Sequence, residues 1–170
     1  LVSGTKYNIA GGRTLVGGTG YDIKFIPDAY AMLYSDGDMI FQRGDEVDEG
    51  KTLKKSYTGF EDVEYSSAKS VPWNINRKNI KNVSFKDEIT PTSLAYWFTN
   101  AGNMTSFNVN NLSLDNVTNM AYTYSSCYNL AGSPICGNNV ISMSNAYYRC
   151  HNLTGNPVCG DKVTDMAYAY

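Results

Sequence analysis

The hydrophobic residues of the C-terminal third recur at a fixed step between Val117 and Tyr170, so that Val117 returns as Val140 and again as Val163. A period in the twenties is typical of a solenoid, in which each unit buries its apolar face against its neighbours. The recurring residues are therefore predicted to hold the buried and turn positions of a structural repeat. In chain order they are Val117, Met120, Cys127, Leu130, Pro134, Cys136, Val140, Met143, Cys150, Leu153, Pro157, Cys159, Val163 and Met166.

Within one unit, the apolar residues from Val117 to Leu130 are spaced three and four residues apart. This spacing predicts a short amphipathic helix over Val117–Tyr128. The following segment, Ser133–Cys136, is short and β-capable, and it predicts one parallel strand per unit. The expected fold class is therefore β-rich α+β, a parallel-stacked solenoid with one short helix and one short strand per unit, preceded by a small β domain.

Upstream of the repeats, the pattern of hydrophobic residues changes to short strands. Ala29–Tyr34 and Met39–Arg43 flank an Asp-Gly turn, which is a strong hairpin signal. Ile80–Phe85 is apolar on alternate residues, as expected for a half-buried strand. These features predict a small β-rich domain over residues 26–86.

Residues 87–116 are expected to form the N-terminal cap of the solenoid, which then covers residues 87–170. Terminal repeats are atypical because they cover the exposed end of the core, and this segment keeps apolar positions without Cys or Pro at the repeat positions. The same step continued backwards pairs Leu94 with Val117, Trp97 with Met120, and Phe107 with Leu130.

Residues 1–25 carry a second, shorter repeat of 14 residues, in which Val2–Ile9 reappears as Val16–Ile23. Glycine pairs between alternating Val, Thr, Tyr and Ile predict short strands and tight turns. The glycines do not predict a phosphate-binding loop, because no helix pattern follows them. This segment is interpreted as a Gly-rich β-hairpin region that serves as an attachment or a linker.

Charge and hydropathy exclude several classes of partner. The net charge of −2 and 18% charged residues leave no basic stripe for nucleic acid and no polybasic patch for a membrane surface. No apolar run approaches the roughly 20 residues that span a bilayer, and no signal-peptide pattern opens the chain. We therefore expect neither nucleic-acid binding nor membrane insertion. The chain starts without Met and stops in mid-repeat at Tyr170, so both ends are interpreted as cuts in a longer protein.

The repeat resembles a known family. The pattern Val-x-x-Met-x-x-x-Tyr-x-x-Cys-x-Asn-Leu, followed by an apolar strand and Pro, resembles the 23-residue leucine-rich repeats of BspA-like bacterial surface proteins. Val117-Thr118-Asn119-Met120 and Val163-Thr164-Asp165-Met166 also resemble the related surface-protein repeats rich in Val-Thr-Asn-Met. The resemblance covers Leu94–Tyr170 and implies a leucine-rich-repeat-like solenoid. The chain departs from the family in its Gly-x-Pro-x-Cys-Gly segment, and in having Tyr124 and Tyr147 where Phe is common.

The N-terminal segment carries a second resemblance. Gly4-Thr5-Lys6-Tyr7 and Gly18-Thr19-Gly20-Tyr21 resemble the Gly-Thr-x-Tyr stretches of minor structural proteins in phage tails from Gram-positive hosts. This resemblance implies a virion protein of a phage tail or fibre, with other virion or surface proteins, and copies of itself, as partners. The alternative is an adhesin on the bacterial cell surface that binds a host protein or glycan.

The cysteine spacing C-x8-C-x13-C-x8-C does not match a zinc site, and no metal or cofactor is expected. Two interpretations of the cysteines stay open. They are reduced, buried, small hydrophobic residues, or they form rung-to-rung disulfides Cys127–Cys150 or Cys136–Cys159.

Catalysis is not expected. His151 is the single histidine and has no recognisable nucleophile and carboxylate around it, and no carboxylate pair recurs for glycoside hydrolysis. A hydrolase of wall polysaccharide is thus disfavoured, and a non-enzymatic structural and recognition protein is predicted. Its contact surface is expected at positions that vary between units or fall outside the buried stripe, because a stack presents them as one extended face. These are Tyr122, Tyr128, Tyr148 and His151.

Overall fold

A computed structural model describes residues 6–9, 13–16 and 24–170 except residue 156. Its first sheet is antiparallel in the order β1-β2-β3, and only Asp28 separates β3 from the next strand. The glycine-rich turns predicted within residues 10–12 and 17–23 lie outside the described residues. The strands are β1 (Lys6–Ile9), β2 (Arg13–Val16) and β3 (Lys24–Pro27).

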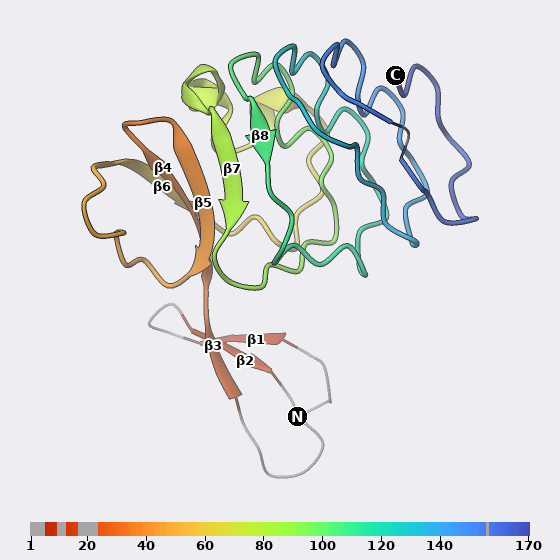
Figure 1. Cartoon of the computed structure of the whole chain (residues 1–170). Coiled ribbons are helices and arrows are strands. Elements are labelled where there is room, and N and C mark those ends of the chain that lie inside the picture. Colours follow the sequence, from red (N-terminus) through yellow and green to blue (C-terminus); the bar gives the residue numbers. More distant parts are fainter. Residues whose placement is uncertain (1–5, 10–12, 17–23, 156) are drawn as a thin grey trace.

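The second sheet has five strands in the order β6-β4-β5-β7-β8 (Figure 1). β4 pairs antiparallel with β5 and β6, whereas β5–β7 and β7–β8 are parallel. β8 lies beyond the expected boundary at residues 86 and 87, yet it belongs to this sheet. The strands are β4 (Ala29–Tyr34), β5 (Asp38–Arg43), β6 (Leu53–Thr58), β7 (Asn82–Phe85) and β8 (Ser106–Phe107).

The predicted hairpin at the Asp-Gly turn is confirmed by β4 and β5. Gly37 adopts a φ of 101° and its N–H donates to the carbonyl of Tyr34 over 3.1 Å. A Cβ at this position would lie 2.7 Å from the side chain of Lys81, so both the backbone angle and the space require glycine.

The predicted solenoid of helices and strands is wrong. The described residues contain only two short 3-10 helices, η1 (Ala68–Ser70) and η2 (Asn74–Asn79), and neither lies in the repeat region. Val117–Tyr128, where a helix was predicted, contains turns over residues 121–126 and an isolated β-bridge at Asn119, and Ser133–Cys136 forms no strand. The β-rich character is retained, but the repeats are turns that follow one another towards the C-terminus (Figure 1).

The hydrogen bonds explain why the repeat does not become helical. Alternate N–H groups, those of Met120, Tyr122, Tyr124 and Ser126, donate to carbonyls of the following repeat at 2.7–2.9 Å. The N–H groups of Thr123 and Ser125, which lie between them, and that of Cys127 donate to the carbonyl three residues earlier. An α-helix would instead direct each N–H to the carbonyl four residues earlier. Successive repeats are thus joined by main-chain hydrogen bonds that a helix would consume internally.

This arrangement needs left-handed backbone at two positions of a turn. Tyr122 and Ser126 have φ of 58° and 63°, and Asn145 and Arg149 in the next repeat have 55° and 62°. L-residues other than Asn and Asp visit this region rarely. The sequence therefore did not predict these turns, because Tyr, Ser and Arg are not residue types that indicate a positive φ.

The predicted register of the cap is also wrong. The N–H of Leu94 donates to Asn119, as that of Met120 donates to Ser142 and that of Met143 to Asp165. Leu94 therefore corresponds to Met120 and not to Val117. The step from Leu94 to Met120 is thus longer than the step from Met120 to Met143. Three additional residues between Thr105 and Leu114 account for the difference.

Aromatic side chains stack along the repeats. Phe98 and Tyr124 have ring centroids 5.8 Å apart, Tyr124 and Tyr147 5.2 Å, and Tyr147 and Tyr170 5.7 Å, all close to parallel. This column continues into one hydrophobic core, which extends from Ala29 in β4 to Tyr147 in the stack of repeats.

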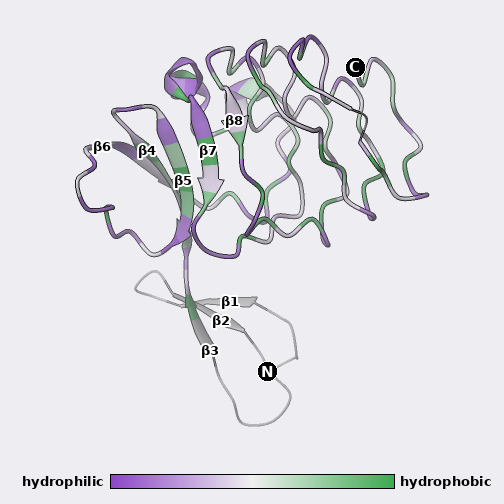
Figure 2. Cartoon of the chain, in the orientation of Figure 1, coloured by the Kyte–Doolittle hydropathy of each residue, from purple (hydrophilic) through white to green (hydrophobic). Residues whose placement is uncertain are grey.

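Figure 2 shows hydrophobic colouring along the middle of β5 and hydrophilic residues in the loops that border it. No helix of the described part is long and apolar enough to cross a membrane.

A candidate binding groove on the repeat stack

The repeating residues lie mainly inside the stack. Most of those from Val117 to Met143 are buried, whereas those from Cys150 onwards are half-buried and Met166 is exposed. Pro134 is buried and Pro157 half-buried. Exposure thus increases towards the C-terminal end of the described stack.

The four cysteines are free thiols and form two pairs of corresponding positions. The thiols of Cys127 and Cys150 donate to the carbonyls of Phe98 and Tyr124, over 3.1 and 3.0 Å. Burial raises the pKa of the Cys127 thiol well above its usual range and that of Cys150 to about 11. The Cys127 thiol is buried and the Cys150 thiol is half-buried, and both bond the preceding turn.

The other two cysteines meet at a methionine. The Sγ atoms of Cys136 and Cys159 lie 3.2 and 3.1 Å from Sδ of Met143. Burial, followed by the neighbouring Cys159, raises the pKa of the Cys136 thiol to about 12. No group of three or more His, Cys, Asp or Glu residues in the described part could hold a metal ion.

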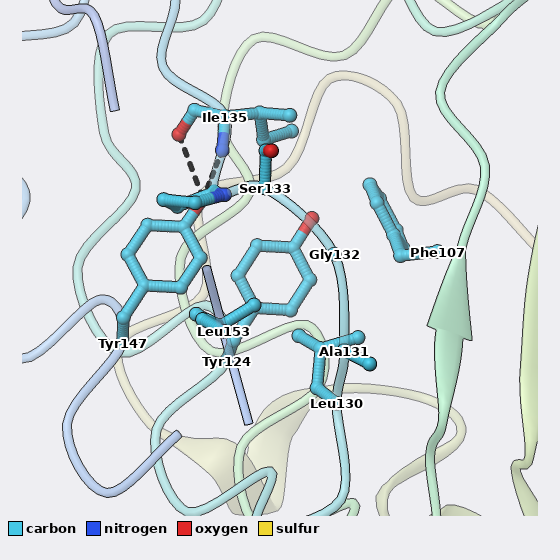
Figure 3. A pocket seen from close by; sticks show the side chains of 10 residues that line it. Phe107, Tyr124, Leu130, Ala131, Gly132, Ser133, Ile135, Tyr147 and Leu153 are labelled. Carbon is cyan, nitrogen blue, oxygen red and sulfur yellow. Dashed lines mark hydrogen bonds between the residues drawn. The ribbon is translucent and has the colours of Figure 1, made fainter. Parts of the chain in front are cut away.

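A small cavity of about 50 Å³ lies beside the stacked tyrosines (Figure 3). The hydroxyl of Tyr147 accepts from the N–H of Ile135 over 2.8 Å and donates to its carbonyl over 2.7 Å. Tyr124 holds the corresponding place one repeat earlier, and its buried hydroxyl has no hydrogen-bond partner among the described residues. Two buried tyrosines of one column therefore differ in whether the hydroxyl has a hydrogen-bond partner among the described residues.

This difference gives a matched pair of variants. Tyr147→Phe is expected to lower the free energy of unfolding by about 1–2 kcal/mol, because it leaves backbone groups of Ile135 without their partner. Tyr124→Phe is expected to be neutral or to stabilise by up to about 1 kcal/mol. Urea denaturation of both variants measures the contrast. Equal destabilisation by the two changes would contradict it.

A larger, open groove of about 540 Å³ lies between η2 and the turns of the stack. We call it the basic groove, and its six lining residues include two cations and no carboxylate. They are Arg77, Lys78, Asn100, Gly102, Asn103 and Tyr128.

Hydrogen bonds between segments far apart in sequence hold the walls of the basic groove. Asn103 Nδ2 donates to the carbonyl of Lys78, and Asn129 Nδ2 donates to that of Gly102, each over 2.7 Å. A Cβ on Gly102 would lie 3.2 Å from the ring of Tyr128. Glycine thus lets the Tyr128 ring lie close against the main chain at the rim.

Arg77 is held from within its own 3-10 helix. Its Nη1 donates to the main-chain carbonyl of Asn74 over 3.1 Å and also to the Oδ1 of Asn74. Its Nε is buried and has no hydrogen-bond partner among the described residues. The guanidinium is therefore positioned by one residue while part of its donor capacity is unused by the described chain.

The aromatic edge, which consists of Tyr128, Tyr148, Arg149 and His151, adjoins the basic groove through Tyr128. The rings of Tyr128 and His151 stack with centroids 6.2 Å apart, and Arg149 lies 5.0 Å from the ring centre of Tyr148. Hydrogen bonds with the side chains of Ser126 and Arg149 hold the pKa of the Tyr128 phenol below its usual range. Tyr128 is 43% exposed, so this anchored ring still presents surface.

Three of the four predicted contact residues gather at the aromatic edge, and Tyr122 does not. Tyr122 is half-buried and stacks on Tyr96, with ring centroids 5.0 Å apart and planes within 5°. The sequence interpretation missed Arg77, Lys78, Asn100, Asn103 and Arg149. Arg149 had a signal, because it lies at a variable position between Tyr148 and His151, whereas Arg77 and Lys78 precede the repeats and had none.

Comparison with protein-family models, with characterised proteins and with solved structures finds no match. The functional interpretation therefore depends on the groove and its residues.

Proposed function

We propose that this chain is a non-enzymatic structural and recognition protein that binds a cell-surface component through the basic groove and its aromatic edge. The observation that carries the proposal is the stacked and partly exposed pair Tyr128 and His151 beside a groove lined by Arg77 and Lys78. Tyr and Arg are enriched among the residues that dominate binding energy at interfaces. They present a large, rigid contact area at low entropic cost.

The support for recognition also includes rigidity. Tyr128 follows a turn whose main chain is hydrogen-bonded to both neighbouring turns, and Arg77 is fixed by Asn74. Preformed side chains lose little conformational entropy on binding. A groove built on such a frame suits contact with an external partner.

Two locations suit this activity. The Gly-Thr-x-Tyr stretches favour a tail or fibre protein of a phage virion, with copies of itself or other virion proteins as assembly partners. The repeat pattern favours, as the second candidate, an adhesin of the bacterial cell surface that binds host protein or glycan. Antibody against the chain would label phage particles in the first case and bacterial cells in the second.

Binding of the fluorescently labelled chain to cell walls purified from Gram-positive bacteria tests the proposal. Tyr128→Ala is expected to weaken binding by about tenfold or more, because truncating a tyrosine that dominates the binding energy costs about 2 kcal/mol or more, and about 1.4 kcal/mol corresponds to tenfold. Tyr168→Ala is the matched control, since Tyr168 is 74% exposed and is not among the residues that line the groove. No binding to any wall preparation, or equal binding by the Tyr128 variant, would contradict the proposal.

A further inference from the structure

We infer that the basic groove binds an anionic sugar residue, one that carries a carboxylate or a phosphate group, within a polysaccharide. This inference rests on the proposed recognition function and names the chemistry of its ligand.

The charge of the groove opposes that of the chain. The whole chain has 16 acidic and 14 basic residues and a net charge of −2, yet the described residues that line the groove include Arg77 and Lys78 and no carboxylate. Arg149 adds a third cation at the rim through its hydrogen bond with the Tyr128 side chain. A local positive charge on an acidic protein favours a negatively charged ligand.

The donors match an oxyanion. A guanidinium presents its N–H groups in a planar fork that suits the paired oxygens of carboxylate or phosphate. Asn74 occupies Nη1 of Arg77, and the buried Nε has no partner among the described residues. Lys78 is exposed beside it and supplies a second, mobile charge. The two cations together can hold one anionic group.

The remainder of the groove matches a sugar ring and not a bare ion. The volume of about 540 Å³ lies within the range of small-molecule pockets and far exceeds the needs of phosphate alone. The ring of Tyr128 offers an apolar face with a polar tip, which suits the C–H face of a sugar. Asn100 and Asn103 add amide groups, which suit sugar hydroxyls.

The test uses the Gram-positive wall polysaccharide fraction that binds the 170-residue chain. One sample is carboxyl-reduced, a second is dephosphorylated with hydrofluoric acid, and a third receives both treatments. Loss of binding by tenfold or more after the first treatment identifies carboxylate as the anion, and after the second identifies phosphate. Binding that survives both treatments overturns the anionic ligand but leaves recognition by the groove intact. No binding to the untreated fraction overturns the proposed function itself.

Charge-reversal variants connect the ligand to the groove. Lys78→Glu is expected to weaken binding by tenfold or more, whereas Lys78→Arg retains it and Lys55→Glu, an exposed lysine of β6, changes it less than twofold. Thermal melting verifies that each variant is folded. Equal loss in the Lys55 and Lys78 variants overturns the groove as the site. Stronger competition by polyglutamate or a single-stranded oligonucleotide than by the soluble wall polysaccharide overturns the sugar as the ligand class.

Discussion

Phe41→Ala is expected to lower the free energy of unfolding by about 3–5 kcal/mol, the usual cost of truncating a fully buried aromatic residue. Phe41 is 0% exposed in β5. Its ring centroid lies 4.8 Å from that of Phe85, 5.4 Å from Trp97 and 5.6 Å from Trp73. A loss of this size is comparable to the whole stability of many small domains, about 5–15 kcal/mol.

Because one core extends from β4 into the stack, Phe41→Ala should also loosen the repeats. Urea denaturation, followed by fluorescence of Trp73 and Trp97, reports on the core around Phe41, and alkylation of the buried Cys127 thiol reports on the following repeat. Ile75→Ala is the control, since Ile75 is 86% exposed in η2 and its truncation is expected to change stability by less than about 0.5 kcal/mol. Full protection of Cys127 after the sheet has unfolded would contradict a shared core.

Stability is expected to fall steeply as the pH rises above 10. Burial, followed by neighbouring phenol and thiol charges, raises the pKa of Tyr124 well above its ordinary value of 10.0. Burial also raises the pKa of Tyr147, although the Ile135 backbone opposes this shift. Above pH 10 the unfolded chain loses these protons while the folded chain keeps them. Each tyrosine then lowers the free energy of unfolding by up to about 1.4 kcal/mol per pH unit.

The sign of this effect follows from the direction of both shifts. Below pH 10 both phenols are protonated in the folded and unfolded states, so they add no pH dependence there. Urea midpoints at pH 8, 9, 10 and 11 measure the decline, to which the raised pKa of Cys127 contributes from about pH 9. Tyr124→Phe should flatten the slope above pH 10, and Tyr168→Phe is the exposed control. Constant stability up to pH 11 would show that the two phenols ionise freely in the folded chain.

The part of the fold that the sequence predicted depends on strong local signals. The Asp-Gly turn admits few conformations, and the alternation in Ile80–Phe85 has a period unique to strands. Both elements are present, as the β4–β5 hairpin and as β7. Local chemistry was sufficient at these places because the turn or the period determined the structure without help from distant residues.

The prediction of a helix over Val117–Tyr128 was wrong because the spacing of its hydrophobic residues fits more than one structure. Consecutive turns with i to i−3 hydrogen bonds also place side chains such as Met120, Tyr124 and Cys127 on one side at spacings of three and four. The deciding factor was non-local, since the N–H groups of Tyr122 and Tyr124 found carbonyls in the next repeat. A pattern within one unit cannot reveal a hydrogen bond between units.

The predicted register of the cap was wrong for a different reason, because it assumed that every repeat has the same length. Leu94-Ala95-Tyr96-x-Phe98 resembles Met120-Ala121-Tyr122-x-Tyr124 and Met166-Ala167-Tyr168-x-Tyr170, so a signal for the true correspondence was present. The sequence held less evidence for the basic groove, because η2 and the turn at Asn100–Asn103 are separate segments that come together only in the folded chain. Of its lining residues, only Tyr128 was identifiable from the variation between repeats.

The unequal length of the first and later repeats has an evolutionary consequence. Three extra residues lengthen only the segment between Thr105 and Leu114. The residues around Leu94 and Met120 keep their one-to-one pairing through main-chain hydrogen bonds. Main-chain pairing on one side thus tolerates a change of length on the other. The segment that corresponds to Thr105–Leu114 in each later repeat, such as Ala131–Gly137, is consequently a place where the length of a repeat can change while the main-chain pairing on the opposite side is kept.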